Sequence, residues 1–402
     1  MGCVTPIGIG VAEFADALRR GVSGVRRITL FDPSGYQSTV AAEVSEFDPL
    51  DFMDLREARA LPRVAQFSLA ACRLALADAG LGDWRDPARV GIIVGTSSGS
   101  IAYALEQHSI FLEKGVRRVH PSMPAYAHNS IVASECAIQL GIHGPALAVS
   151  SACTSAADAI GLGCAMISTG MVDVVLVGGA DAPICPAIVA SFDRLGMLPR
   201  SYNDRPSQAA RPFDAGREGL VLGEGAGILI LEGEAYARRR GARMLAVIAG
   251  YGATCDASSH FRQEDTGTDA RRAIQAAMMA AGIEADAVGY INAHGTGTRE
   301  NDPFEAKVLH SVFGASPVLV SSSKSQVGHL LGACGAVELI ASIIGMEASF
   351  VPPTLNLEKI DPACSMLNYV GTDAREVAYD AALSVSFGFG SRNAALVVGK
   401  VR

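Results

Sequence analysis

Charge is scarce in this chain: only 18% of its 402 residues are Asp, Glu, Lys or Arg, and Trp occurs once. Apolar residues are scattered, and no run is long and pure enough to predict a helix that spans a bilayer. The first ten residues, MGCVTPIGIG, carry no charged leader region of the kind found in signal peptides. We therefore expect a cytoplasmic protein that does not contact a membrane.

The nine Cys residues form no CxxC pair and no Cys/His cluster. An odd number of dispersed cysteines in a reducing compartment predicts small buried side chains rather than a disulfide framework or a zinc site. The net charge of −8 argues against a nucleic-acid partner. We expect no resident metal and no contact with nucleic acid.

Short apolar runs alternate with Ala-rich stretches over nearly the whole chain, a pattern typical of an α/β fold. Continuous apolar runs of this length indicate strands that are buried on both faces. Strands are predicted at Arg89–Gly95, Asp173–Asp181, Gly227–Glu232, Ala287–Ala293, Pro317–Ser323, Ala382–Ser386 and Ala394–Lys400, and helices at Pro62–Ala79, Ser155–Ser168, Thr268–Ala281 and Ala333–Glu347.

A division of the chain is predicted near Gly241, where the basic run Arg238–Arg240 ends and a fresh strand, Met244–Gly250, begins. Each side of this point contains several strand–helix units. We therefore predict two similar halves, residues 1–242 and residues 243–402, the first with the candidate nucleophile and the second with two candidate catalytic histidines described below.

The stretch Ala148–Gly163, AVSSACTSAADAIGLG, predicts a strand, a corner of small residues and then a helix. Cys153 lies at this corner, where the helix dipole and free N–H groups favour a thiolate. Small neighbours, Ala152 among them, let a substrate approach, and the backbone can direct an N–H at a developing oxyanion. Cys153 is therefore a candidate nucleophile, and the alternative is a buried structural cysteine.

A candidate histidine lies at the carboxyl end of another predicted strand. His294 ends that strand in INAHGTGT, Ile291–Thr298, and active-site groups commonly project from the carboxyl ends of strands in α/β folds. Thr296 and Thr298 offer hydroxyls and exposed backbone to an extended ligand that carries amides. The alternative is a capping His in a Gly-rich turn.

Lys324 follows a predicted strand in VSSSKSQVGHLLGACG, Val320–Gly335, and His329 begins an Ala/Gly-rich helix that also carries Glu338. A Lys among small residues, five positions before a His, is poorly explained as a solvated charge alone.

The last stretch, FGFGSRN at Phe387–Asn393, predicts a Gly-punctuated loop between two strands. Its aromatic side chains are either core plugs or a movable gate.

Together and in this order, the four stretches resemble the β-ketoacyl synthase family of the Cys-His-His kind. The resemblance covers essentially the whole chain and includes TPIG at Thr5–Gly8, ARPFDAGREGLVLGEGAG at Ala210–Gly227 and VPPTLNL at Val351–Leu357. It implies a thiolase-type fold, with two related α/β halves in five layers, αβαβα, and an obligate dimer. It also implies an acyltransferase that condenses malonyl carrier protein with an acyl group and releases CO₂.

The resemblance implies a role for each matching residue. Cys153 takes the acyl group from an acyl carrier protein as a thioester. His294 and His329, neutral and donating Nε–H, stabilise the enolate that forms when malonyl loses CO₂. Lys324 orients this network, with Glu338 as the buried acid beside it. The other implied positions are the gate Phe389, whose N–H joins that of Cys153 at the oxyanion, the phosphopantetheine contacts Thr296 and Thr298, and the substrate-site residues Ala152, Phe387 and Asn393.

The chain departs from the family pattern in two places. The family opens with a strand that ends in Thr-Gly-Met-Gly, and Met1–Gly2 stand where the Met-Gly of that turn belongs. We therefore expect a further strand upstream of Met1. The gate loop of the family is FGFGG, whereas Ser391 and Arg392 follow Gly390 here. This change concerns the motion of the loop rather than the chemistry.

Several stretches favour the ketosynthase subunit of a type II polyketide system over a housekeeping fatty-acid elongation synthase II. They are GTRENDPFEA at Gly297–Ala306, DAPICPAIVASFD at Asp181–Asp193, and NSIVASECAIQL at Asn129–Leu140, where Glu135 suggests a modified acyl pocket. The alternative of another class is a non-catalytic subunit like a chain-length factor, and the presence of Cys153 and both histidines argues against it.

The implied partner is an acyl carrier protein, which is acidic, so a basic patch is expected near the mouth of the pocket. Arg56 and Arg59 fall where the family has a basic helix start, and the alternative is an ordinary solvated face. No cofactor is expected, because phosphopantetheine arrives on the carrier. The dimer is expected to be either a homodimer or a heterodimer with a Cys-lacking subunit like a chain-length factor.

Overall fold

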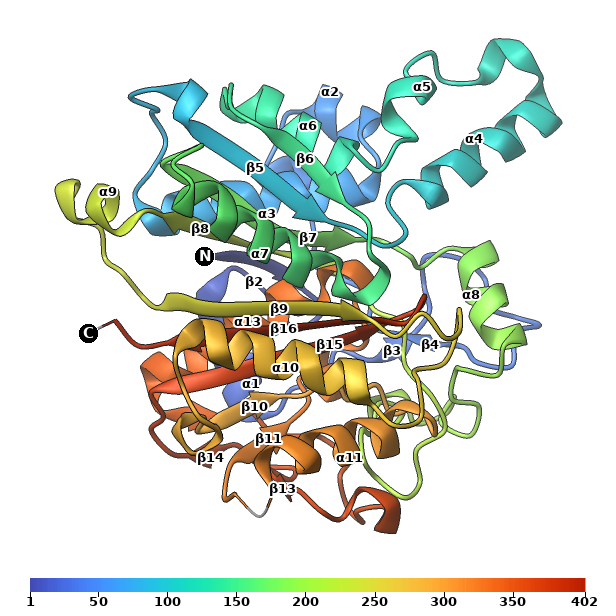
Figure 1. Cartoon of the computed structure of the whole chain (residues 1–402). Helices are drawn as coiled ribbons and strands as arrows, with labels where there is room; N and C mark the ends of the chain where they lie inside the picture. The colour runs from blue at the N-terminus through green and yellow to red at the C-terminus, as the bar shows by residue number, and fades with distance from the viewer. Residues whose placement is uncertain (315, 402) are drawn as a thin grey trace.

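Two six-stranded sheets form the frame of the protein (Figure 1). The computed structural model describes residues 1–314 and 316–401. The prediction of a strand upstream of Met1 stays a prediction. The first sheet comes from the first half of the chain, in the order β2 (Gly8–Ile9), β1 (Gly2–Thr5), β8 (Gly225–Glu232), β7 (Val174–Asp181), β5 (Val90–Gly95) and β6 (Ala146–Val149).

The second sheet comes entirely from the second half of the chain. Like the first, it combines parallel pairs with antiparallel ones. The predicted division near Gly241 lies in sequence between the strands of the first sheet and those of the second. The division of the chain into two halves at this point stays a prediction. The strand after it begins at Val247 rather than at Met244. The order of strands is β13 (Asn368–Tyr369), β11 (Leu319–Ser321), β10 (Tyr290–Asn292), β15 (Ala381–Gly388), β16 (Arg392–Gly399) and β9 (Val247–Cys255).

Helices α7 (Ser155–Ser168) and α13 (Cys334–Ala348) lie between the two sheets and form a middle layer (Figure 1). Helix α7 packs on β5 and β7 of the first sheet and on β9 and β16 of the second, while α13 packs on β8 and β15. Every residue from Cys334 to Met346 is buried, as expected for a helix that is apolar all round.

Two outer layers of helices complete the fold. Helices α3 (Arg63–Ala79) and α6 (Ile131–Leu140) cover the first sheet, and α10 (Thr268–Ala281) and α11 (Asn301–Phe313) cover the second. This arrangement confirms the predicted α/β fold in five layers, αβαβα. The other elements are α1 Val11–Arg20, α2 Leu55–Ala60, α4 Ile101–Lys114, α5 Met123–Tyr126, α8 Pro186–Arg194, α9 Glu234–Arg239 and α12 Lys324–Val327, with the short pairs β3 Arg26–Arg27 and β4 Val40–Ala41, and β12 Phe350–Val351 and β14 Arg375–Glu376.

One helical stretch, Leu331–Ala348, is long and apolar enough by length and composition to cross a membrane. The expectation that no run would pass this test is therefore wrong. The position of the stretch explains its composition, because 89% of it is buried inside the protein. It contains α13, the core helix that both sheets cover.

Two motif positions differ from the predictions by a few residues. β10 ends at Asn292, so His294 lies in the loop after the strand. His329 does not begin the helix, because α13 starts only at Cys334. The reason is a backbone contact: the N–H of His329 donates to the carbonyl oxygen of Val221 at 2.7 Å, which holds this segment extended beside the first half of the chain.

The close approach of α7 to β9 depends on a glycine. A Cβ at Gly161 would lie 2.4 Å from the ring of Tyr251, whose hydroxyl donates to Asp158 at 2.7 Å and so holds the ring in place. We expect Gly161→Ala to lower the free energy of unfolding by about 1–3 kcal/mol, because the packed interior cannot absorb the added methyl group. Thermal melting measures the effect. Gly82→Ala, where the added Cβ meets nothing within 4 Å, is the control and should melt like the native protein.

Candidate active site

Cys153 lies at the strand-to-helix corner that the sequence predicts. β6 ends at Val149, a 3-10 turn covers Ala152–Thr154, and α7 follows directly. Ala152 has a left-handed backbone, with φ at +56°. The hydroxyl of Ser155 fixes this corner, because it accepts from the Ser151 N–H at 2.9 Å and donates to the Ala152 carbonyl at 2.6 Å. Cys153 itself is 7% exposed.

The two predicted histidines lie together although they come from different loops. Their ring centroids are 5.3 Å apart and their planes are nearly perpendicular, at 86°. Lys324 places Nζ 3.3 Å from Nδ1 of His294 and forms a buried ion pair with Glu338. The side chains of Lys324 and Glu338 are each only 2% exposed. The structure therefore brings all four of these residues into one cluster.

The electrostatics of the cluster keep both imidazoles uncharged. Burial lowers the pKa of His294 and of His329 well below the usual range, and the nearby Lys324 ammonium lowers both further. Burial also opposes the charge of Lys324, but the Glu338 carboxylate outweighs it and raises the pKa of the lysine. The site thus holds one buried cation, its counter-ion and two neutral rings that can donate or accept hydrogen bonds.

Cys153 shares this electrostatic environment. Burial raises the pKa of its thiol to about 12, although Lys324 and the backbone N–H of Phe389, which donates to the sulfur, both act to lower it. Removal of the sulfur from water thus opposes the thiolate that the helix N-terminus was expected to favour, and Cys153 rests as a thiol.

The loop that carries His294 is held by two acids that sequence reasoning missed. The Glu305 carboxylate accepts the backbone N–H of His294 at 2.6 Å and that of Gly295 at 2.7 Å. Burial raises the pKa of Glu305 to about 7. Asp302 accepts the Gly297 N–H at 3.1 Å. Both acids lie on α11, where a helical pattern gives no sign that they face inward.

A third buried acid joins the loops on the other side of the cluster. Asp181, at the end of β7, accepts backbone N–H groups from Ser97, Ser98 and Gly332 at 2.7, 2.9 and 2.7 Å. Gly332 lies just after His329, so this carboxylate helps to position the second histidine. Asp181 begins the stretch Asp181–Asp193 that resembles polyketide ketosynthases, but nothing in the sequence indicated that its carboxylate binds these backbone N–H groups.

Thr296 and Thr298 are both buried, and their hydroxyls lie 3.0 Å apart. The hydroxyl of Thr298 also accepts the Asn301 N–H at 3.1 Å, at the start of α11. Thr298 borders a cavity of about 350 Å³. The other residues that line this cavity are Gly196, Met197, Leu198, Arg200, Ser201, Glu218, Gly219, Arg299 and Glu300.

The predicted gate loop is shorter than expected. β15 continues to Gly388 and β16 begins at Arg392, so Phe387 and Asn393 belong to strands. Phe387 packs its ring edge-on against His294, with centroids 5.8 Å apart. Asn393 is directed elsewhere and donates to Asp256 at 2.5 Å.

Phe389 lies in the short turn between these strands. Its ring is 6.2 Å from that of Phe192 and 5.5 Å from that of Phe261. Ser391, where the family has glycine, adopts a φ of +62°. Its hydroxyl accepts the N–H groups of Ser258 and Ser259 at 3.2 and 3.0 Å. These bonds join the turn to the segment that follows β9.

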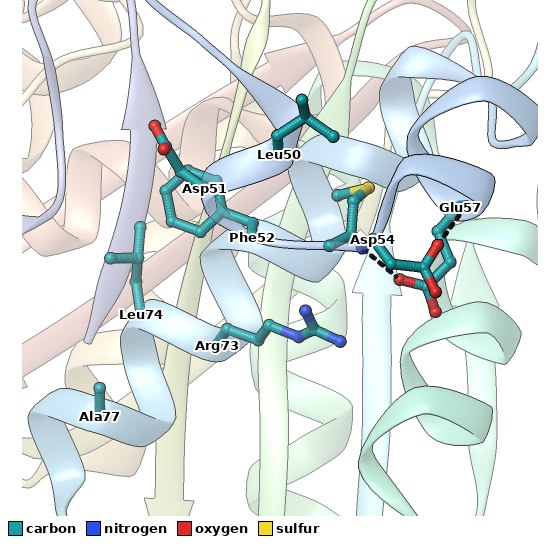
Figure 2. Close-up of a pocket in the computed structure, with 9 residues that line it drawn as sticks. Leu50, Asp51, Phe52, Asp54, Glu57, Arg73, Leu74 and Ala77 are labelled. Carbon is teal, nitrogen blue, oxygen red and sulfur yellow. Dashed lines mark hydrogen bonds between the residues drawn. The ribbon is translucent and has the colours of Figure 1, made fainter.

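Arg56 and Arg59 lie apart from this cluster, exposed on α2. Beside α2 is a hollow of about 670 Å³ (Figure 2). None of the predicted catalytic residues lines it, and its rim carries three acids and Arg73. The residues around the hollow are Leu50, Asp51, Phe52, Met53, Asp54, Glu57, Arg73, Leu74 and Ala77.

In the described ranges, 1–314 and 316–401, no group of three or more His, Cys, Asp or Glu could hold a metal ion.

Comparison with known proteins defines the class. Residues 1–237 match the β-ketoacyl synthase N-terminal domain and residues 245–358 match the β-ketoacyl synthase C-terminal domain. The chain therefore belongs to the β-ketoacyl synthase family, as the motifs predicted, and it is an enzyme of the acyltransferase class.

Its relatives include both kinds of condensing enzyme. A 3-oxoacyl-[acyl-carrier-protein] synthase 2 of Synechocystis is 37% identical over 403 residues, covering 100% of this chain and 96% of the relative. An actinorhodin polyketide putative β-ketoacyl synthase 1 of Streptomyces coelicolor is 39% identical over 409 residues, covering 99% and 87%. The chain is thus similar to fatty-acid and polyketide synthases to nearly the same degree.

Solved structures confirm the thiolase-type fold of a ketosynthase. The ishigamide ketosynthase/chain length factor is 34% identical with a TM-score of 0.92, and the match covers 100% of this chain and 98% of that one. A type II PKS acyl-carrier protein in complex with its ketosynthase bound to the hexaketide is 30% identical with a TM-score of 0.90, with the same coverage.

The raised pKa of Cys153 predicts how its reactivity depends on pH. Since only the thiolate reacts with iodoacetamide, alkylation of Cys153 should accelerate steadily from about pH 7 to about pH 9 without a plateau. Peptide mass spectrometry measures the rate at this residue. A rate already constant across that range would mean that the thiolate is the resting form.

The two N–H bonds that Glu305 accepts predict a structural and catalytic defect in Glu305→Gln. Its amide offers one acceptor oxygen and presents an NH₂ group to a backbone donor, so unfolding should become about 1–3 kcal/mol easier. His294 should shift, and decarboxylation of malonyl thioesters should slow. Melting and CO₂ release measure both effects. Glu284→Gln, an exposed acid in the segment after α10, should change neither, and equal behaviour of the two variants would contradict this assignment.

Proposed function

We propose that the chain condenses a malonyl unit with an acyl group held on Cys153, and that acyl carrier protein delivers both. The observation that carries this proposal is the grouping of a buried thiol with two neutral imidazoles around the Lys324–Glu338 ion pair. Catalysis of this kind needs a nucleophile that becomes acylated and uncharged donors that stabilise a developing enolate.

The first half-reaction transfers the acyl group. The sulfur of Cys153 attacks the thioester carbonyl, a new carbon–sulfur bond forms, and the bond to the phosphopantetheine sulfur breaks. The thiol proton of Cys153 leaves with the phosphopantetheine thiol. The oxyanion accepts hydrogen bonds from the backbone N–H groups of Cys153 and Phe389. The Phe389 N–H already donates to the Cys153 sulfur in the resting protein, so it points at the reacting centre.

The second half-reaction makes the carbon–carbon bond. Malonyl thioester loses CO₂, and the electron pair of the broken bond forms an enolate whose oxygen accepts Nε2–H bonds from His294 and His329. The enolate carbon attacks the acyl carbonyl on Cys153. The new carbon–carbon bond forms as the cysteine sulfur leaves, and this sulfur then takes a proton from solvent. Neutral rings suit the step, because they donate to the enolate without surrendering a proton to it.

We further propose that the chain is the ketosynthase subunit of a type II polyketide system. Glu135 supports this assignment, because it is a buried acid on the largely apolar helix α6, where it accepts from Gln139 at 2.9 Å. A polar group there suits an oxygenated or unsaturated chain better than a saturated one. The second candidate is a fatty-acid elongation synthase II, which the Synechocystis relative favours. Cys153 argues against a non-catalytic subunit.

The proposed protein acts as a dimer in the cytoplasm, either with a second copy or with a Cys-lacking subunit. β6 is the last strand at one edge of the first sheet, and an exposed edge invites pairing with another chain. Helix α4 projects away from the body of the protein (Figure 1) and exposes Phe111 and Leu112, which are 46% and 69% exposed. These apolar surfaces fit an interface between subunits.

No resident cofactor enters the proposed reaction, since phosphopantetheine arrives on the carrier protein. Its amides and hydroxyl have candidate partners in the neighbouring residues Thr296 and Thr298. The cavity beside Thr298 is lined by Arg200 and Arg299 as well as by Glu218 and Glu300, and its two guanidinium groups are candidate partners for the phosphate of the arm.

The test is to incubate the protein with acyl and malonyl carrier proteins and to follow intact mass. We expect an acyl adduct on the native protein and none on Cys153→Ala, followed by a β-ketoacyl product. His329→Ala should still form the adduct but should not release CO₂. If the native chain forms no adduct, even with a purified partner subunit, the proposed function is wrong.

The product separates the two pathways. A polyketide ketosynthase should need a Cys-lacking partner subunit and should extend poly-β-keto or unsaturated chains. Elongation of medium-length saturated acyl carriers by a homodimer alone would instead support the fatty-acid enzyme. Native mass measurement of the active species gives the subunit composition in the same experiment.

Arg56 and Arg59 predict a docking face for the acidic carrier, with Leu55 exposed beside them on the same short helix. We expect Arg56→Glu with Arg59→Glu to raise the KM for malonyl carrier protein about tenfold, while decarboxylation of a small malonyl thioester is unchanged. The exposed pair Arg238 and Arg239 on α9, reversed in the same way, is the control. Equal KM values for the two double variants would place docking elsewhere.

A further inference from the structure

The thiol of Cys334 touches one of the two imidazoles. Its sulfur lies 3.0 Å from Nδ1 of His329. Cys334 is the first residue of α13, one of the two helices of the middle layer, and it is 1% exposed, while His329 is 3% exposed. The contact is therefore shielded from water, where a polar pair has no competing solvent partner.

The surrounding groups favour one direction for this hydrogen bond. The backbone N–H of Leu330 donates to the sulfur of Cys334, so the sulfur is already an acceptor on that side. Burial raises the pKa of Cys334 well above its ordinary value, which keeps the proton on sulfur, and burial lowers the pKa of His329. An S–H of Cys334 that donates to Nδ1 leaves the single ring proton of His329 on Nε2.

His294 is arranged in the same way by a different residue. Lys324 carries only donors on its ammonium and lies 3.3 Å from Nδ1 of His294, so this nitrogen accepts and Nε2 carries the proton. The two rings thus each have a buried group that can donate within reach of Nδ1, a lysine for His294 and a cysteine for His329. Fixing the tautomer of an imidazole through its second nitrogen is a general way to orient it.

We propose that Cys334 is a positioning residue that holds His329 in its Nε2–H tautomer, ready to donate to the thioester oxygen of the malonyl group. This role rests on the proposed function. The competing explanation is that Cys334 only fills space in the middle layer, where it packs with Ala333, Ala336 and Val337. The two explanations differ in whether the hydrogen or the volume of the thiol matters.

Three substitutions at Cys334 separate hydrogen from volume. Cys334→Ser keeps a donor, Cys334→Val keeps the bulk without a donor, and Cys334→Ala removes both. The measurements are kcat and KM for decarboxylation of malonyl carrier protein, together with the rate of acyl transfer to Cys153. Cys72→Ala truncates another buried cysteine, on α3, and is the matched control.

We expect kcat for decarboxylation to fall roughly 3- to 10-fold in both the Val and the Ala variants, as for the loss of one hydrogen bond. KM and acyl transfer should stay close to native values, since neither depends on the tautomer of His329. The Ser variant should retain kcat within about twofold of native, and Cys72→Ala should match the native enzyme.

Contrary outcomes are distinguishable. If the Val variant keeps native kcat, or if the Ser variant falls as far as the Ala variant, Cys334 acts by packing and the inference is wrong. The proposed function then still stands if His329→Ala loses decarboxylation. If the folded native enzyme releases no CO₂ under any condition, both the proposed function and this inference are wrong. Melting temperatures of all variants identify any loss caused by unfolding.

Discussion

The buried ion pair of Lys324 and Glu338 organises the rest of the site. Two opposite charges this far from water are stable only because each satisfies the other. Glu338 belongs to the central helix α13, and Lys324 begins α12, so the pair ties the catalytic loops to the middle layer. Lys324 also reaches Nδ1 of His294 and lowers the pKa of both imidazoles. Loss of either partner would leave a buried charge beside the reacting atoms.

Burial is the second constraint, and it shapes every titrating group around the ion pair. It keeps His294 and His329 neutral, and it keeps Cys153 protonated. A dry site strengthens hydrogen bonds to an enolate, yet it makes the resting thiol a weak nucleophile. Acylation must therefore include the loss of the cysteine proton. Glu305 lies under the same constraint while it holds the backbone of the His294 loop.

Sequence patterns predict the parts of this protein that depend on local chemistry. Long apolar runs marked the buried strands, and helices Ser155–Ser168 and Thr268–Ala281 have the predicted bounds. The motifs also identified Cys153 and its cluster. What they missed depends on contacts between distant segments: Glu305 resembles any helical acid until its helix is packed, and the delayed start of α13 depends on a backbone bond from His329 to another half of the chain. Cys334 was one of nine similar cysteines, and only the position of His329 distinguishes it.

The central claim is that two neutral imidazoles present Nε2–H groups to the substrate. It is tested most directly by nitrogen-15 NMR of protein labelled only at histidine, with His294→Ala and His329→Ala used to assign the two signals. The account predicts that both rings are neutral Nε2–H tautomers from about pH 6 to about pH 8, with no titration in that range. An imidazolium signal, or a proton on Nδ1 of either ring, would contradict it.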